Sequence, residues 1–148
     1  MCPYTCTSGV SNTQTVVTYA EWLNTFEWSY YCTLGTRYSM SVKSARRAAE
    51  RLYSHLQKHI GNVRVFWVAE PFDTKYGYHL HALIHIGNPV LSGAIELIKK
   101  AWQVVTKGKG GKGYNNTVIE PYKKELGANY YVSKYMLRHN SDYDIHLK

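Results

Sequence analysis

Residues 79–86, HLHALIHI, alternate between two kinds of side chain, and this period of two constrains the fold more than any other feature. Side chains of a β-strand point alternately to its two faces, so His79, His81, Leu83 and His85 share one face. Residues 80, 82, 84 and 86 form an all-aliphatic opposite face, which requires a hydrophobic core. We therefore expect a strand that faces the core on one side and places His79 and His81 on the exposed side of a sheet.

The rest of the chain predicts further strands and the helices that cover them. Strand patterns occupy residues 30–36, 63–70, 78–86 and 116–122, while helix patterns occupy residues 41–58 and 91–106. This order predicts an α+β fold, a split βαβ (ferredoxin/RRM-like) antiparallel sheet with helices on one face. An additional C-terminal helix is expected over residues 128–138.

The expected domain organisation is simple, because 148 residues suit one domain. We expect an N-terminal arm over residues 1–27 that includes a short helix near its end. The folded domain is expected over residues 28–140, and a C-terminal tail over residues 141–148. No apolar run approaches the roughly 20 residues that span a membrane. Three cysteines form no disulfide framework, which favours a reducing compartment.

Charge and aromatic content point toward a polyanionic partner. The net charge is +8, and residues 99–148 carry 10 Lys and Arg against 4 acidic residues, whereas residues 1–98 carry 8 against 6. The chain also holds 14 tyrosines. Basic segments mixed with aromatic residues suit nucleic acid, which offers phosphates and stackable bases. The alternative is a basic domain with a solvated positive face.

Glu70 extends the pair of histidines into a candidate metal site. It ends the strand that should pair antiparallel with residues 78–86, so its carboxylate could reach His79 and His81. Two imidazoles and one carboxylate leave coordination positions open, and this mixed set suits Mn²⁺ or Mg²⁺. His85 is the weaker candidate ligand. The alternatives are structural histidines and an exposed strand-end carboxylate.

The last expected helix carries a second group of reactive side chains. Tyr131, Lys134, Tyr135 and Arg138 follow helical spacing and would share one face. Tyrosine with an ordinary pKa near 10 is a poor nucleophile at neutral pH, but a nearby ammonium stabilises the phenolate. Taken alone, this helix is better explained by core tyrosines and a solvent-facing lysine.

Together these motifs resemble those of the HUH endonucleases, particularly the rolling-circle replication initiator (Rep) proteins. Residues 31–36, YCTLGT, look like the first motif of that family. Residues 79–81, HLH, match its His-hydrophobic-His motif, and residues 131–134, YVSK, match its YxxK nucleophile motif. The resemblance spans about residues 28–138, and the combination is far more specific than either short motif alone.

This resemblance implies a metal-dependent, site-specific single-strand DNA endonuclease and strand transferase that initiates rolling-circle replication. Tyr131 would attack the scissile phosphate, leaving a free 3′-OH and a 5′-phosphotyrosyl link. Lys134 would orient or stabilise that phosphate, and the two histidines and the carboxylate would hold Mn²⁺ or Mg²⁺. Tyr135 would be a second nucleophile if two tyrosines alternate, although a single-tyrosine enzyme is nearly as well supported.

We expect the DNA contacts to come from the first motif, a Lys- and Gly-rich loop and the last helix. The candidate residues are Thr33, Arg37, Lys107, Lys109, Lys112 and Arg138. The resemblance implies single-stranded origin DNA, in a hairpin, as the substrate of a monomer or weak dimer. A helicase and a polymerase would come from the host or a partner. The compartment would be the cytoplasm of a bacterial or archaeal cell, or the host nucleus for a eukaryotic virus.

Two other functions remain open from the sequence. An HUH transposase or relaxase would share the same chemistry, although relaxases usually place the nucleophile near the N-terminus. A non-catalytic module of the RNA-recognition-motif kind would need stacking aromatic residues on its central strands, for which Tyr31 and Trp67 are candidates.

Overall fold

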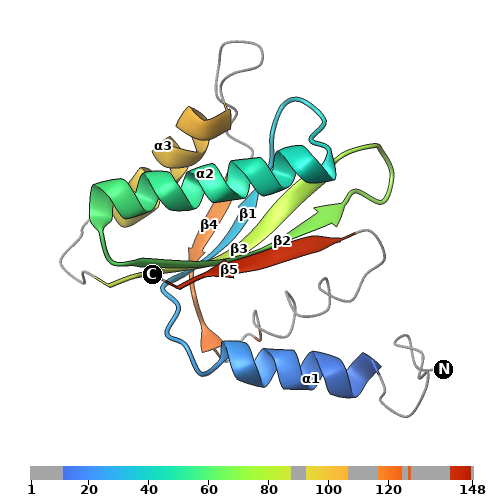
Figure 1. Cartoon of the computed structure of the whole chain (residues 1–148), viewed down its shortest axis with the longest axis vertical. Helices are drawn as coiled ribbons and strands as arrows, with labels where there is room; N and C mark the ends of the chain where they lie inside the picture. Colours follow the sequence, from blue (N-terminus) through green and yellow to red (C-terminus); the bar gives the residue numbers. More distant parts are fainter. Residues whose placement is uncertain (1–11, 88–92, 107–116, 125–126, 128–140, 148) are drawn as a thin grey trace.

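The computed structural model describes residues 12–87, 93–106, 117–124, 127 and 141–147 (Figure 1). The described elements are α1 (Asn12–Leu23), β1 (Tyr30–Leu34), α2 (Val42–Ile60), β2 (Val63–Pro71), β3 (Tyr78–Ile86), α3 (Ala94–Thr106), β4 (Thr117–Pro121) and β5 (Asp142–His146). The chain is therefore α+β, as predicted. The expected helix over residues 128–138 lies outside the described residues. None of the helices that are described combines the length and apolar character needed to cross a membrane.

The five strands form one sheet in the order β4-β1-β3-β2-β5, and every neighbouring pair is antiparallel (Figure 1). Its first four strands have the order of a split βαβ unit, which is compatible with the predicted ferredoxin-like fold. The β2–β3 pair is a hairpin in which Glu70 faces His79 and Pro71 faces Tyr78. This pairing brings together the strand ends on which the candidate metal ligands lie.

Helices α2 and α3 cover one face of the sheet (Figure 1). The aliphatic residues 80, 82, 84 and 86 of β3 face this side and join Trp67 and Trp102 in the main core. The indole of Trp102 is fully buried, and its Nε1 donates a hydrogen bond to the carbonyl oxygen of Gly35 at 2.8 Å. The period-two pattern of β3 thus identified the core-facing side correctly.

Helix α1 lies on the other face, so the prediction that helices occupy one face only was wrong (Figure 1). The helix also begins earlier in the chain than the sequence suggested, inside the segment interpreted as an arm. Val16, Ala20 and Leu23 are buried at helical spacing, and Leu23 packs in a second core with Phe66 of β2. This stripe of small and aliphatic residues is short, which makes it difficult to recognise in a polar N-terminal segment.

Strand β5 corrects the interpretation of residues 141–148 as a tail. It pairs with β2 from Asp142 beside Ala69 to His146 beside Val65. Ile145 packs against the second core, on the α1 side of the sheet. The sequence hid this strand because acidic residues alternate along it, and such residues are disfavoured in strands without a tertiary partner.

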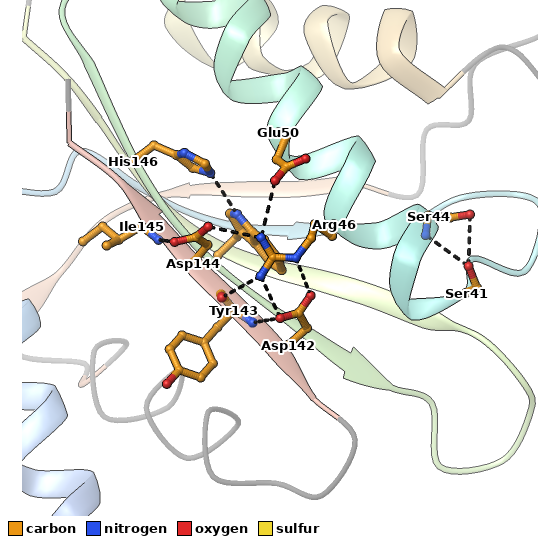
Figure 2. Close-up of polar contacts among 10 residues, drawn as sticks. Ser41, Ser44, Arg46, Glu50, Asp142, Tyr143, Asp144, Ile145 and His146 are labelled. Carbon is orange, nitrogen blue, oxygen red and sulfur yellow. Dashed lines mark hydrogen bonds and ion pairs between the residues drawn. The ribbon is translucent and has the colours of Figure 1, made fainter.

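That partner is Arg46 of α2, which connects β5 to the helix layer (Figure 2). Its guanidinium donates to the two carboxylate oxygens of Asp142 at 2.8 and 2.9 Å and to Asp144 at 3.2 Å. It also donates to the carbonyl oxygen of Tyr143 at 3.3 Å and lies 5.2 Å from the ring centroid of Trp67. One guanidinium therefore pairs with both aspartates of the strand.

Replacing Arg46 by Met is expected to lower the free energy of unfolding by about 1–2 kcal/mol. The aliphatic stem would still cover Trp67, but the charge-assisted bonds would be lost, and their partial exposure keeps the effect moderate. Urea denaturation measures the change. Arg47→Met is the matched control, because Arg47 is exposed and forms no ion pair with any other described residue. Equal losses in both variants would contradict a special role for Arg46.

Candidate metal centre

The β2–β3 hairpin places three potential metal ligands together. Glu70 is the last residue but one of β2, and His79 and His81 lie at the start of β3. The register pairs Glu70 with His79 and Val68 with His81, so all three ligand side chains lie on the α1 side of the sheet. The loop between the strands is closed by a hydrogen bond from the amide of Phe72 to the carbonyl oxygen of Gly77 at 3.0 Å.

Gly77 adopts a backbone conformation that side chains with a Cβ rarely tolerate. Its φ is 123°, and a Cβ built at this position would lie 3.4 Å from Ser39. Glycine is therefore the residue that lets the chain turn directly into β3. The local sequence thus fixes the register that places His79 opposite Glu70.

The three donor atoms form a nearly equilateral triangle. Oε1 of Glu70 lies 3.0 Å from Nε2 of His79 and 3.1 Å from Nε2 of His81. The two Nε2 atoms are 3.1 Å apart. These three residues are the one group of His, Cys, Asp and Glu side chains in the described part of the chain whose atoms converge closely enough to share a metal ion.

The size of this triangle fits a divalent ion. Nitrogen and oxygen ligands at about 2.1 Å from an octahedral ion lie about 3.0 Å apart when they are neighbours. A tetrahedral ion would separate the same ligands by about 3.4 Å. Glu70, His79 and His81 therefore fit one face of an octahedron, with the opposite face left for other ligands.

Glu70, His79 and His81, called the triad from here on, are not exposed as the strand pattern predicted: two of the three are buried and His79 is partly buried. His81 is 5% exposed and Glu70 is 7% exposed. Part of the burial arises because Leu83 and Phe66, on the same face of the sheet, pack with Leu23 of α1 in the second core. Burial opposes ionisation of Glu70, but hydrogen bonds from His79 and His81 outweigh it and lower its pKa to about 2. The carboxylate therefore carries its negative charge at neutral pH.

Two aromatic rings support the imidazoles from outside the triad. Tyr31 of β1 stacks on His81, with ring centroids 6.1 Å apart and planes 7° apart, and its Oη is hydrogen-bonded to Nδ1 of His81 at 3.2 Å. Phe72 stacks on His79 with centroids 4.6 Å apart. Sequence reasoning did not identify these contacts, although the position of Tyr31 within the first motif was a signal for the first one.

The Tyr31 hydroxyl is expected to raise metal affinity by fixing the orientation of His81. Ligating histidines generally use their second ring nitrogen in such a bond, and loss of the partner weakens metal binding by about 10-fold or more. We therefore expect Tyr31→Phe to bind Mn²⁺ about 10-fold more weakly in a titration followed by electron paramagnetic resonance. Tyr30→Phe is the control, because Tyr30 packs against the helix-side core. Identical affinities for the two variants would contradict this role.

The other predicted site residues fall into two groups. Thr33 pairs with His81 in the sheet register, and Arg37 is exposed in the loop that follows β1, so both lie on the strand end that carries the triad. His85 pairs with Arg64, four residue pairs along the sheet from the His81–Val68 pair, and its Nδ1 is 3.5 Å from Oγ of Ser29. The remaining predicted residues lie outside the described part of the chain: Lys107, Lys109, Lys112, Tyr131, Lys134, Tyr135 and Arg138.

Trp67 and Tyr31, the candidate stacking residues of a nucleic-acid-binding module, both contact other parts of the protein. Trp67 is fully buried on the helix-covered side of the sheet. Tyr31 is half-buried and contacts His81 with both its ring and its hydroxyl. Trp67 therefore offers no open face on which a base could stack.

The site is a β-hairpin that presents two imidazoles and one carboxylate to a single point. Comparisons with known proteins found no matching family model, no matching curated protein and no matching solved structure.

Proposed function

We propose that this protein is a metal-dependent, site-specific single-strand DNA endonuclease and strand transferase that initiates rolling-circle replication. The observation that carries the proposal is the convergence of Glu70, His79 and His81 on one point. Their triangle suits Mn²⁺ or Mg²⁺ and would leave coordination positions for phosphate oxygens. A bound ion of this kind would draw electron density from the phosphate and make its phosphorus more electrophilic.

The position of β5 supports a link between this triad and the YxxK motif. Asp142 opens β5 beside Ala69, the residue that precedes Glu70. The chain that leads into β5 therefore reaches the sheet at the same end as the triad. At about 3.5 Å per residue, the 11 residues from Tyr131 to Asp142 span up to about 40 Å, which is long enough for Tyr131 to reach the triad.

In the proposed reaction, Tyr131 is the nucleophile. Its hydroxyl loses a proton, its Oη forms a bond to the scissile phosphorus, and the bond from phosphorus to the 3′-oxygen breaks. The leaving 3′-oxygen takes up a proton, giving a 3′-OH and a 5′-phosphotyrosine. Lys134 stabilises negative charge on the phosphate as the bonds exchange. Attack by a 3′-OH reverses the step and rejoins a strand without ATP, because the phosphotyrosine retains the phosphodiester energy.

The proposed function is tested by trapping the covalent intermediate. The wild-type protein is incubated with Mn²⁺ and a library of end-labelled single-stranded oligonucleotides, including the DNA that flanks its own gene. We expect a labelled band at the mass of protein plus DNA on a denaturing gel, and its loss when EDTA replaces Mn²⁺. Absence of an adduct on every oligonucleotide, with the protein folded and Mn²⁺ bound, would refute the proposal.

A further inference from the structure

A groove lies between α2 and α3, on the sheet face opposite the triad. Its volume is about 630 Å³. One wall is the outward side of α2, and the other is the C-terminal end of α3. We call it the α2–α3 groove, and it is lined by Arg47, Glu50, Arg51, Ser54, His55, Lys58, Val104 and Val105.

The charge of this groove is strongly positive and is not balanced locally. Arg47, Arg51 and Lys58 are exposed and form no ion pair with any acidic group that the structure describes. The acidic residue in the lining is Glu50, whose carboxylate lies 3.4 Å from Nη1 of Arg46. Three cations therefore share one concave surface with a single carboxylate, and none of the three forms an ion pair with it.

The pKa of His55 is consistent with this positive environment. Burial lowers the pKa of His55, and the neighbouring His59 and Lys58 lower it further. The rings of His55 and His59 stack with centroids 4.2 Å apart. Because like charges disfavour protonation, this end of the groove would gain most from an anionic ligand.

The spacing of the cations suits an extended polyanion more than a single small anion. Arg47 and Arg51 are one helical turn apart, about 6 Å along the axis, and Lys58 lies about 10 Å further along. Val104 is 43% exposed on the opposite wall and offers an apolar surface that can contact a sugar. A strand of nucleic acid combines regularly placed phosphates with apolar sugar edges.

We propose that the α2–α3 groove binds the sugar–phosphate backbone of DNA beyond the nucleotides held at the triad. The choice of DNA as the ligand rests on the proposed function. The positive charge of the groove is a property of its lining and does not depend on that function. Since the triad lies on the other side of the sheet, a strand must be long enough to pass round the edge of the sheet before it can occupy both. The groove would therefore extend the footprint of the protein along a long substrate and would contribute little to binding of a short one.

The test compares two double variants that remove the same charge. Arg47→Ala/Arg51→Ala removes groove cations, and Lys99→Ala/Lys100→Ala removes two cations from α3 that lie outside the groove lining. Fluorescence anisotropy measures binding of oligothymidylates of about 10 nucleotides, within the usual site size of one small domain, and of about 30 nucleotides, well above it. Each measurement is repeated over a range of salt concentrations.

For the longer oligonucleotide, we expect the groove variant to bind about 10-fold more weakly than wild type. The slope of log affinity against log salt should fall by about 1.4, since two phosphate contacts are lost at about 0.7 each. The shorter oligonucleotide should bind the groove variant and wild type equally. The lysine control should behave as wild type with both lengths.

Two outcomes would overturn the inference. Equal losses in the groove and lysine variants would mean that only net charge matters. Unchanged binding of the longer oligonucleotide by the groove variant would mean that the groove receives another anion, such as an acidic protein segment. Neither outcome depends on cleavage, because the wild-type adduct assay decides the proposed function separately. Thermal unfolding followed by circular dichroism confirms that each variant is folded.

Discussion

Replacing Tyr131 by Phe is expected to abolish the covalent protein–DNA adduct, slowing its formation by at least about 1,000-fold. The substitution removes the oxygen that would form the bond to phosphorus and leaves the ring in place. Metal binding should be unchanged, because the triad belongs to the β2–β3 hairpin. The measurement is the rate of adduct formation with Mn²⁺ on a denaturing gel, together with a Mn²⁺ titration of the same variant.

Tyr135→Phe and Tyr130→Phe are the matched controls for this experiment. Each removes one hydroxyl from the same segment, and both should retain the adduct. Loss of the adduct in Tyr135→Phe alone would show that Tyr135, not Tyr131, is the nucleophile. Retention in both Tyr131→Phe and Tyr135→Phe, with loss in the double variant, would instead support two alternating tyrosines.

Glu70→Gln is expected to weaken Mn²⁺ binding by more than about 100-fold and to remove metal-dependent adduct formation. A group that only orients a ligand contributes about 10- to 100-fold to metal affinity, and a charged ligand should contribute more. Gln keeps the shape of the side chain but not its charge, and Glu70 supplies the single carboxylate of the triad. Electron paramagnetic resonance of free Mn²⁺ and the adduct assay provide the two measurements.

Glu120→Gln is the control for removal of one negative charge. Glu120 is exposed on β4 and pairs with Tyr31, so it lies on the triad side of the sheet but outside the group of ligands. This variant should bind Mn²⁺ as wild type does. If Glu70→Gln also keeps wild-type affinity, the triad is a hydrogen-bonded structural cluster, and the proposed metal chemistry fails with it.

The site could be predicted to the extent that local rules fix it. Alternation along β3 places His79 and His81 on one face, and the short connection to β2 makes a hairpin that returns Glu70 to the same end. Both steps depend on residues close together in the chain. The three candidate ligands therefore converge as predicted, while metal binding, the identity of the ion and the reaction stay predictions.

The features that the sequence did not reveal depend on distant contacts. The alternating aspartates of β5 form a strand because Arg46 pairs with them, and Arg46 is 96 residues away from Asp142. The burial of His81 depends on how the sheet face is covered, which a strand pattern cannot specify. Helix α1 also depends on a distant contact, because its short apolar stripe is buried through the packing of Leu23 with Phe66.

The separation between Arg46 and β5 also has a consequence for the order of folding. Contacts between residues far apart in sequence carry the largest loop-closure cost and generally form late. Strands β1, β2 and β3 and helix α2 can associate through nearer neighbours before Asp142 reaches Arg46. During synthesis, the metal ligands would therefore be assembled before the segment with Tyr131 is anchored at its far end. Under the proposed function, a nascent chain would therefore bind its metal ion before it could cut DNA.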